Sequence, residues 1–383
     1  MAKYKLGDIC EIVSGCTPKT GIDEYWNGDI KWITPAELSD ESYVISDSVR
    51  KITDLAVKKT GMTSLPVGTV LLSSRAPIGK VAIAGCEMYC NQGFKNLICS
   101  DNINNRYLYW FLKGNTAFLN SLGRGATFKE ISKSIVSEIE INVPDIQEQE
   151  EAVANLEKIN KVIALRKREL VLLEDLISAR FVEMFGDPLD KKIANMIFAD
   201  CLEFNPKKSE VKDLQDIQAS FVPMECIGTD GSFAIKDKGI IREYYKGYTY
   251  FRDGDVLLAK ITPCFENGKV AIAENCENGI GFGTTEFHVL RPRKDISNSY
   301  WIKYLLKNER VHELATMNMS GSAGQKRIQT PFFEKLRIYL PPIELQNQFA
   351  DFVRATDKLK VEVQKSLDET QTLFDSLMQK YFG

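Results

Sequence analysis

The sequence lacks the features typical of a secreted or membrane-embedded protein. No stretch approaches the roughly 18 uninterrupted apolar residues that a membrane-spanning helix requires. The N-terminal residues MAKYKLGDIC contain no apolar core of the kind found in secretion signals. We therefore expect a cytoplasmic protein without membrane segments.

Histidine is scarce, and cysteine occurs without a pattern. The chain has only two histidines, His288 and His312, and nine cysteines, an odd number with no Cys-x-x-Cys pair. A disulfide framework and a Cys/His zinc site both need more regular spacing than this. We expect reduced cysteines that serve as small buried apolar side chains, and no metal site.

Catalytic motifs are also missing. The two Gly-Lys pairs at Gly79 and Gly268 are followed by Val where a phosphate-binding loop needs Ser or Thr. The segment GIGFG (279–283) lacks the spacing of a dinucleotide site, and no GxSxG elbow occurs. The loosely spaced acidic residues Asp190 and Glu210 are weak evidence for a nuclease. We therefore predict no catalytic residues.

The formal net charge of −3 would by itself argue against a nucleic-acid-binding protein. The charges are unevenly distributed, however. Acidic side chains outnumber basic ones in residues 145–190 and 341–383, whereas basic side chains slightly outnumber acidic ones in residues 1–144 and 191–340. The whole-chain value therefore averages over segments with different partners, and it does not exclude DNA.

The most informative feature is an internal repeat. Several segments recur in the same order at offsets of 186 to 197 residues. The matching segments are GTVLL (68–72) with GDVLL (254–258), GKVAIA (79–84) with GKVAIA (268–273), and INVPDIQEQ (141–149) with IYLPPIELQ (338–346). The chain is therefore predicted to be two copies of one unit of nearly 190 residues.

Each copy changes character at the proline motif. Before it, short runs such as TVLLS, KVAIA, DVLLA and FHVLR alternate with turn residues and predict β-strands. Each copy also has one helical patch, Arg106–Leu122 in the first and Ser299–Met317 in the second. After the motif, no Gly or Pro interrupts residues 147–185 or 344–382, which predicts a helix of about 60 Å in each copy.

Apolar residues recur along both long helices in steps of three and four, the signature of a coiled-coil seam. The seam residues are Leu156, Ile159, Ile163, Leu170, Leu173, Ile177, Val353, Val363, Leu367, Phe374 and Leu377. An antiparallel pairing of the two helices closes such a chain most simply. The alternative is that each helix packs only on its own globular half.

The predicted architecture is α+β: a tandem repeat of two mixed α/β domains, separated by two long antiparallel coiled-coil helices. The domain boundaries follow from the repeat and the proline motifs. We assign the segments 1–144 and 187–340 to the globular domains, and 145–186 and 341–383 to the helices.

Polar loops at matching places in the two copies have the chemistry needed to contact DNA. Arg, Asn and Gln can hydrogen-bond to base edges, while Lys, Ser and Thr more often hold phosphates. For any one of these residues a solvated loop side chain is an equally good interpretation. The candidates are Ser74, Arg75, Asn91, Gln92, Lys95, Arg124, Thr127 and Lys129 in the first copy, and Lys260, Thr262, Thr284, Thr285, Gln325, Lys326 and Arg327 in the second.

These segments resemble a known family. SGCTPKTGIDEYWNGDIKWITPAEL (14–38), LLSSRAPIGKVAIA (71–84), NQGFKNL (91–97), FRDGDVLLAKITPCFENGKVAIA (251–273) and the stretch from Pro341 are similar to the specificity subunits of type I restriction–modification systems. The resemblance covers essentially the whole chain. One departure is Pro144-Asp145, where the family usually has Pro-Pro; this should affect only the turn into the helix.

The resemblance implies a non-catalytic subunit with two target-recognition domains, each of which reads one half of a bipartite, asymmetric double-stranded DNA target. The long helices would set the gap between the half-sites and bind two adenine-N6 methyltransferase subunits, with restriction/translocase subunits as optional further partners. The chain itself would need no cofactor, since S-adenosylmethionine, ATP and Mg²⁺ would bind to the partner subunits. Two alternatives stay open from the sequence: a stand-alone nuclease or methyltransferase, and a coiled-coil scaffold that does not bind DNA.

Overall fold

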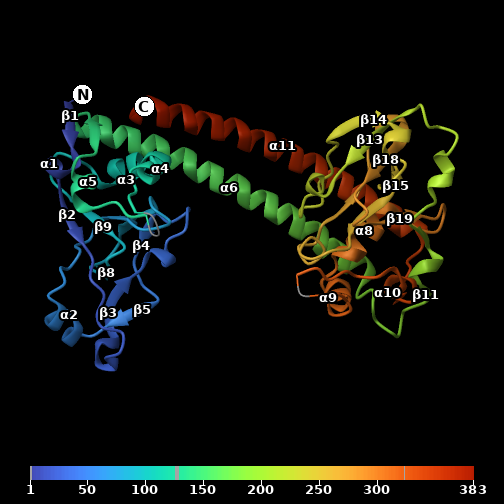
Figure 1. Cartoon of the computed structure of the whole chain (residues 1–383), viewed down its shortest axis with the longest axis horizontal. Helices are drawn as coiled ribbons and strands as arrows, with labels where there is room; N and C mark the ends of the chain where they lie inside the picture. Colours follow the sequence, from blue (N-terminus) through green and yellow to red (C-terminus); the bar gives the residue numbers. More distant parts are fainter. Residues whose placement is uncertain (1, 126–128, 323) are drawn as a thin grey trace. The chain divides into compact units, whose positions relative to one another are not determined.

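The computed structural model describes residues 2–125, 129–322 and 324–383 (Figure 1). These residues form two compact units. Unit 1 contains residues 1–166 and 366–383, and unit 2 contains residues 167–365. Each unit therefore combines one globular part with a section of each long helix.

Unit 1 contains three small sheets. A five-stranded sheet has the order β2-β9-β6-β7-β4, a three-stranded sheet has the order β5-β3-β8, and β1 pairs with β10. The strands are β1 (Ala2–Lys5), β2 (Cys10–Ser14), β3 (Trp26–Ile33), β4 (Val44–Ile45), β5 (Arg50–Ile52), β6 (Val70–Leu72), β7 (Val81–Ala84), β8 (Tyr89–Cys90), β9 (Lys95–Cys99) and β10 (Glu140–Val143). The antiparallel β1–β10 pair, in register from Ala2 opposite Val143, joins the two ends of the globular part.

Unit 2 repeats this plan, but both of its larger sheets have four strands. One four-stranded sheet has the order β12-β19-β16-β17, a second has the order β14-β13-β18-β15, and β11 pairs with β20. The strands are β11 (Met196–Ile197), β12 (Leu202–Phe204), β13 (Gln218–Val222), β14 (Asp237–Ile240), β15 (Thr249–Arg252), β16 (Val256–Ala259), β17 (Val270–Ile272), β18 (Ile280–Gly283), β19 (Phe287–Pro292) and β20 (Arg337–Ile338). The strands predicted from TVLLS, KVAIA, DVLLA and FHVLR are confirmed as β6, β7, β16 and β19.

Short helices cover the sheets of both units, and the predicted helical patches are each broken in two. The helices are α1 (Leu6–Ile9), α2 (Asp54–Thr60), α3 (Asn105–Gly114), α4 (Thr116–Ser121) and α5 (Lys133–Ser137) in unit 1, and α7 (Ile241–Tyr244), α8 (Ser299–Lys307), α9 (Glu309–Met317) and α10 (Thr330–Glu334) in unit 2. The predicted patches are helical, but their sequences gave no sign of the breaks at Asn115 and Asn308. Asn308 leaves the helical conformation, and its side chain caps α9 by accepting a hydrogen bond from the Val311 N–H.

The two long helices are present, and each is 40 residues long: α6 (Ile146–Phe185) and α11 (Ile343–Phe382). α6 ends because Gly186 adopts a left-handed φ of 67°, which glycine tolerates without strain. Within unit 1, Asn155 of α6 donates a hydrogen bond to the Tyr381 hydroxyl of α11 at 3.1 Å. Within unit 2, the rings of Phe181 and Phe349 lie 5.5 Å apart. A residue near the start of α6 thus contacts the end of α11, and a residue near the end of α6 contacts the start of α11. The helices are therefore antiparallel, as predicted.

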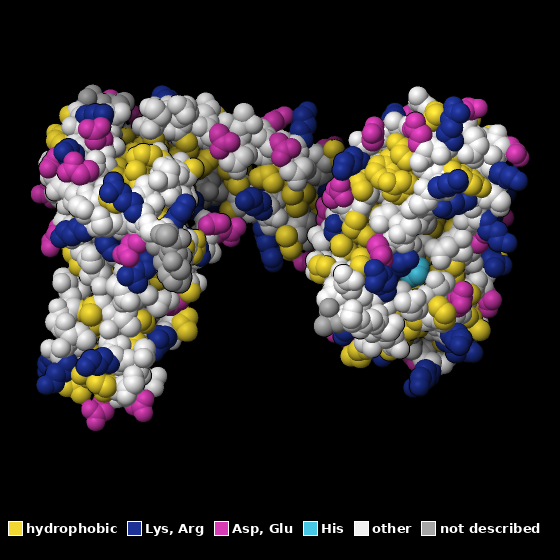
Figure 2. Space-filling model, viewed as in Figure 1, with side chains coloured by type: hydrophobic (Ala, Val, Ile, Leu, Met, Phe, Trp, Pro, Cys, Tyr) yellow, Lys and Arg dark blue, Asp and Glu magenta, His cyan; other side chains and the backbone are white. Residues whose placement is uncertain are grey.

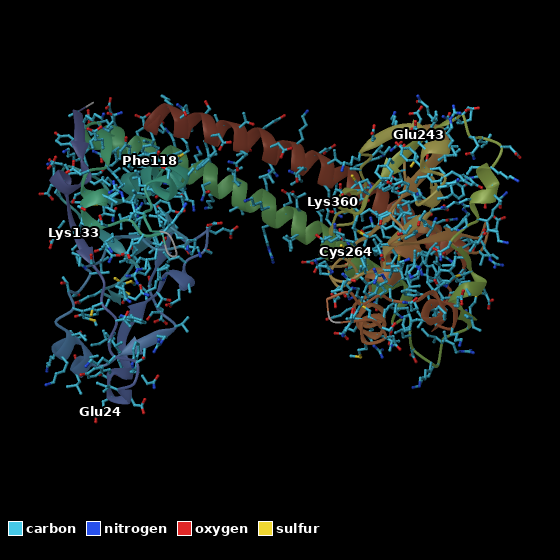
Figure 3. The ribbon with its side chains drawn as sticks, in the orientation of Figure 1. Glu24, Phe118, Lys133, Glu243, Cys264 and Lys360 are labelled. Atoms are coloured by element: carbon cyan, nitrogen blue, oxygen red, sulfur yellow. The ribbon has the colours of Figure 1, made fainter. Side chains whose placement is uncertain are left out.

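The interface between the helices also carries charge. In unit 2, Glu174 of α6 forms ion pairs with Lys307 of α8 at 2.6 Å and with Lys360 of α11, which is labelled in Figure 3. Burial acts to raise the pKa of Glu174, but the two lysines outweigh it and hold this pKa below its ordinary value.

All eleven predicted seam residues are buried or half-buried. They do not form a simple two-helix seam, however. Leu156, Phe374 and Leu377 pack into the core of the unit 1 globular part, around Trp110 and Tyr107. The predicted pairing of the helices and the alternative, packing of each helix on a globular part, therefore both hold, at different sections of the same helix.

A buried glutamine fixes the start of each long helix to the globular part before it. The Gln149 amide accepts a hydrogen bond from the Asn104 N–H (2.8 Å) and donates to the carbonyl oxygens of Asn102 (3.1 Å) and Pro144 (2.9 Å). Gln149 is fully buried. One side chain thus satisfies three backbone groups that burial would otherwise leave unpaired.

Gln346 makes the same three bonds in unit 2. It accepts from the Asn298 N–H (2.9 Å) and donates to the carbonyl oxygens of Ile296 (3.0 Å) and Pro341 (2.8 Å). We call Gln149 and Gln346 the clamp glutamines. Their identical bonding shows that the repeat extends to the three-dimensional contacts.

The turn into the helix differs between the two copies, as expected from Pro144-Asp145. The Asp145 carboxylate accepts a hydrogen bond from the Glu148 N–H at 2.9 Å and so caps α6. Proline occupies the matching position, 342, and offers no side-chain acceptor.

The cysteines are reduced, but they are less buried than expected. Four are buried (Cys10, Cys90, Cys201, Cys276) and five are half-buried (Cys16, Cys86, Cys99, Cys226, Cys264). The interpretation of all nine as buried apolar side chains was therefore wrong for the second group, whose members lie in loops, in a short 3-10 helix (Cys226) and at the end of β9 (Cys99).

We predict that the clamp glutamines are required for stability. Replacing Gln346 by Met keeps the size of the side chain but leaves three buried backbone groups unpaired, at a cost of about 1–3 kcal/mol each. The free energy of unfolding, measured by denaturant titration, should fall by about 3 kcal/mol or more. Gln348, two residues further along α11, is exposed. The control Gln348→Met should change the free energy by less than about 0.5 kcal/mol, and equal losses in the two variants would contradict the clamp.

Candidate functional site

In unit 1, three chain segments meet beside the end of β6, and most of the predicted DNA-contacting residues lie on them. The Ser74 N–H donates to the Gly93 carbonyl oxygen (2.7 Å), and the Ser74 carbonyl oxygen accepts from the Ile131 N–H (2.9 Å). Residues 73–75 are thereby held between the loop before β9 and the described residues 124–125 and 129–131, which we call the return segment of unit 1. Single bridges of the β type join Glu130 of this segment to both Arg75 and Arg124.

The side chains at this junction form one ionic cluster. Arg75 Nε lies 2.9 Å from Glu130 Oε2, and the buried Lys95 Nζ lies 3.2 Å from Glu130 Oε1. Lys95 also donates to the Ser74 hydroxyl at 3.4 Å. Partial burial acts to raise the pKa of Glu130, but the hydrogen bonds and charges of Lys95 and Arg75 outweigh it, so that the pKa is lowered. Glu130 therefore stays ionised and binds both cations.

The other predicted residues of unit 1 lie around this cluster without joining it. Asn91 folds back on its own loop, where its Oδ1 accepts from the Gly93 N–H at 2.9 Å. Gln92 is exposed and accepts a hydrogen bond from the Thr17 hydroxyl. Arg124 and Lys129 are exposed on the return segment, and Thr127 lies outside the described residues.

Unit 2 builds the same junction from matching segments. The Lys260 N–H donates to the Glu286 carbonyl oxygen (2.9 Å), and the Lys260 carbonyl oxygen accepts from the Ile328 N–H (2.9 Å). The Thr262 N–H donates to the Lys326 carbonyl oxygen at 3.0 Å. Residues 320–328, apart from the undescribed Ala323, are the return segment of unit 2. Lys260 thus occupies the place of Ser74.

An arginine–glutamate pair lies at the centre of this second junction. Arg327 Nε lies 3.0 Å from Glu286 Oε2, and Arg327 Nη2 lies 2.9 Å from Glu286 Oε1. The hydrogen bonds with Arg327 lower the pKa of Glu286, and the same bonds raise the pKa of Arg327. This two-point contact fixes the plane of the guanidinium.

A cavity of about 450 Å³ opens next to this pair. Three predicted residues line it, namely Lys260, Thr285 and Arg327, together with Glu286, the neighbour of Thr285. Residues that the sequence analysis did not single out complete the wall: Lys208, Tyr248, Tyr250, His288, Gln329 and Thr330. Thr284, Gln325 and Lys326 do not line it. Thr262 also lies outside the wall, and its hydroxyl is buried without a hydrogen-bond partner among the described residues.

His288 is a buried titratable group of this wall. Its Nε2 lies 2.9 Å from the Ile328 carbonyl oxygen, which makes Nε2 the protonated nitrogen, and its Nδ1 lies 3.4 Å from the Thr330 hydroxyl. Burial lowers the pKa of His288, and the positive charge of Lys260 lowers it further, while the bond to Ile328 and the charge of Glu286 act in the opposite direction. The imidazole is therefore neutral at pH 7.

Glu130, Glu286 and His288 are the members of these junctions that sequence reasoning missed. A closer alignment of the two copies would have indicated one of these residues, His288. Phe94-Lys95 and Phe287-His288 match at an offset of 193, which places a polar residue in a buried strand of both copies. The two glutamates gave no such signal, because each pairs with an arginine that is distant in the sequence.

The charged surface around the junctions is mixed. Figure 2 shows Lys and Arg side chains interspersed with Asp and Glu on the visible face of each unit, with no continuous basic area. Among residues 2–125, 129–322 and 324–383, no group of three or more His, Cys, Asp or Glu side chains is arranged to hold a metal ion. No helix in this part of the chain is long and apolar enough to cross a membrane.

Comparison with known proteins adds the family. A model of the type I restriction modification DNA specificity domain matches residues 1–175 and again residues 200–370. The chain belongs to this family. Each unit contains one copy of the specificity domain, and the two junctions occupy matching places in the two copies.

Individual relatives carry related names. The type I restriction enzyme MjaIX specificity subunit of Methanocaldococcus jannaschii is 40% identical over 217 residues, which are 56% of this chain and 50% of the relative. The EcoAI specificity subunit of Escherichia coli is 42% identical over 182 residues, 46% of this chain and 30% of the relative. The chain thus spans half or less of the length of these curated relatives.

A solved structure matches over the whole chain. The S subunit of a type I restriction-modification system from M. genitalium superimposes with a TM-score of 0.57 at 14% identity, covering 100% of this chain and 96% of that one. At this identity the match shows a shared fold and nothing finer.

We predict that His288 makes stability depend on pH. The unfolded chain binds a proton on this histidine near pH 6.5, whereas the folded specificity domain resists it. The free energy of unfolding should therefore fall as the pH drops below about 6.5, by at most about 1.4 kcal/mol per pH unit. Denaturant titrations between pH 7.5 and 5 should show this slope, and His288→Gln should remove it.

The second histidine provides the matched control. The variant His312→Gln keeps His288, so its free energy of unfolding should fall with decreasing pH as steeply as that of the wild type. The carboxylates with lowered pKa values, Glu130 and Glu286, lose their stabilising effect only below their ordinary pKa near 4.5, outside this range. An unchanged slope in His288→Gln would show that another group causes the pH dependence.

Proposed function

We propose that this chain is the DNA sequence-specificity subunit of a type I restriction–modification enzyme. Each specificity domain would read one half of a bipartite double-stranded DNA target. The observation that carries the proposal is that two copies of one domain place different side chains at matching junctions. Ser74, Arg75 and Lys95 in unit 1 are replaced by Lys260, Ile261 and His288 in unit 2. Different side chains select different bases, so the target would be asymmetric.

The predicted residues fall into two chemical classes in this proposal. Arg75, Gln92 and Arg327 have exposed hydrogen-bonding groups and would read base edges. Lys260, which follows β16, and the exposed lysines of the return segments, Lys129 and Lys326, would hold phosphates. Asn91, Thr284 and the buried Lys95 bond within their own unit and would act by positioning these loops.

We propose further that the chain itself is not an enzyme. The support is the absence of a catalytic motif in the sequence and the structural engagement of the polar groups at both junctions. Catalysis would belong to partner subunits: two adenine-N6 methyltransferase subunits that bind S-adenosylmethionine, and restriction subunits that use ATP and Mg²⁺ if they are present. Such an assembly would act on DNA in the cytoplasm.

The long helices would bind the methyltransferase subunits and set the gap between the half-sites. On α6, Val162, Leu165, Leu172 and Leu176 follow one side of the helix in steps of three, seven and four residues, and all four are exposed. Exposed apolar faces of this kind usually bind a partner. The seam residues of α6 lie about a third of a turn further round the helix and would act on the partners only by keeping this face in place.

The two-domain proposal predicts separate control of the two half-sites. The full chain is co-expressed with its methyltransferase partner, and the methylated adenines are mapped in the DNA. Gln92→Ala should relax the specificity of one half, and Thr285→Ala that of the other, each by about fivefold or more at one base pair. If either substitution affected both halves equally, the domains would not read separate half-sites. Gln348→Ala, on the exposed face of α11, should leave the methylated sequence unchanged.

The spacer proposal predicts that helix length sets the gap. Seven residues are inserted into both helices where the units divide, between Arg166 and Lys167 and between Lys365 and Ser366. One heptad keeps the apolar side in phase and adds about 10 Å, or about three base pairs at roughly 3.4 Å each. The methylation map should show a gap longer by about three base pairs with both half-sites unchanged. The same insertion between Lys191 and Lys192, in an exposed loop, should leave the gap as it is.

A further inference from the structure

Each specificity domain holds one partly exposed arginine against a glutamate from a different chain segment, but the return segment supplies the glutamate in unit 1 and the arginine in unit 2. In unit 1, Arg75 follows β6 and Glu130 lies on the return segment. In unit 2, Arg327 lies on the return segment and Glu286 precedes β19. Glu130 and Arg327 occupy matching places, because each forms the β-type bridges that join its return segment to the residues after β6 or β16. The same pair is thus built twice from different residues.

Stability is a weak explanation for these pairs. Exposed ion pairs contribute roughly 0–1 kcal/mol, and the backbone bonds already described hold the return segments in place without them. The Arg75 and Arg327 side chains keep 46% and 34% of their surface exposed. Both arginines are therefore accessible to a ligand although each is held by a carboxylate.

The contacts leave donors available in a fixed plane. Glu130 binds Arg75 through Nε, and the two terminal nitrogens of Arg75 have no hydrogen-bond partner among the described residues. Glu286 binds Arg327 along the edge formed by Nε and Nη2, and Nη1 donates to the Gln325 carbonyl oxygen at 3.2 Å. Each terminal nitrogen has two hydrogens, so Nη1 and Nη2 of Arg327 each keep one. Both guanidinium groups can still offer two parallel N–H donors from their outer end.

The surroundings favour a base over a phosphate as the acceptor. The ionised Glu130 and Glu286 lie next to the arginines and repel phosphate groups at short range. Lys208 and Lys260 line the same cavity as Arg327. Among the described residues that line it, Glu286 is the one acidic side chain. These lysines suit the phosphate backbone, and the arginine suits a neutral acceptor pair.

We propose that Arg75 and Arg327 each read a guanine in the major groove, and that Glu130 and Glu286 are positioning residues that hold the guanidinium planes. Guanine offers the acceptors N7 and O6 side by side, and two parallel arginine donors match this pair. Fixing the plane beforehand removes part of the entropy cost of binding. The inference rests on the proposed function, and it requires at least one G·C pair in each half of the target.

The test uses the full chain in complex with its methyltransferase partner. Methylation mapping first gives the target sequence. Short duplexes then carry 7-deazaguanine, which pairs normally but lacks the N7 acceptor, at one guanine at a time. For one guanine in each half, the substitution should weaken binding by about fivefold or more. Arg75→Ala should abolish this loss in one half only, and Arg327→Ala in the other.

Lysine and glutamine variants separate reading from structure. Arg75→Lys and Arg327→Lys keep the charge and the ion pair but lose the planar fork, so they should lose the response to 7-deazaguanine while their thermal stability stays near that of the wild type. Glu130→Gln and Glu286→Gln should reduce the response without abolishing binding. Lys5→Ala and Lys236→Ala break exposed ion pairs elsewhere in units 1 and 2 and should leave the response unchanged.

The outcomes distinguish the inference from the proposed function. A complex that methylates no defined sequence would refute the specificity subunit itself. A defined target with no G·C pair in one half would overturn only the guanine assignment. A response to 7-deazaguanine that survives in Arg75→Ala and Arg327→Ala, or glutamate variants that lose stability but keep the full response, would show that the pairs merely close the return segments.

Discussion

The clamp glutamines are the interaction on which the rest of the structure depends. A long amphipathic helix has no preferred direction relative to the domain that precedes it, because apolar packing is not directional. Gln149 and Gln346 supply the direction. Each ties the first turn of a long helix to the loop at the start of α3 or α8 through three buried hydrogen bonds. The register of the helix against its globular part, and hence the depth at which Leu156 or Phe349 enters the core, follows from these bonds.

The two junctions show how one backbone arrangement can serve different side chains. The hydrogen bonds that hold Ser74 and Lys260 in place use only N–H and carbonyl groups, so they do not depend on which side chains the loops carry. The return segment can then supply either member of an ionic pair. It supplies Glu130 as the partner of Arg75 in unit 1, and Arg327 as the partner of Glu286 in unit 2. A domain built in this way keeps its fold while the chemistry of its exposed loops changes, which a specificity domain requires.

Local patterns in the sequence predicted the elements, and long-range contacts decided what could not be predicted. Apolar runs at 70–72 and 256–259 and the steps of three and four in α6 and α11 depend on neighbouring residues, and the predicted strands and helices are confirmed. The breaks at Asn115 and Asn308 were missed because apolar periodicity continues through them. Gln149 reads as an ordinary solvated helix residue until Asn102 and Asn104 are known to lie beside it. Among the candidate site residues, Arg75 and Arg327 were found by residue type, but Glu130 and Glu286 become partners only when the return segments fold.

The composition of unit 1 has a consequence for the order of synthesis. Its core around Tyr107, Trp110 and Phe111 is completed by Phe374, Leu377 and Phe382, which follow the whole of unit 2 in the chain. At about 5–20 residues per second, the roughly 200 intervening residues take about 10–40 s to translate. During this interval the first domain exposes an aromatic surface on the ribosome, and only the last turns of α11 cover it. The core of the first domain to be synthesised is therefore completed only by the last residues to be synthesised.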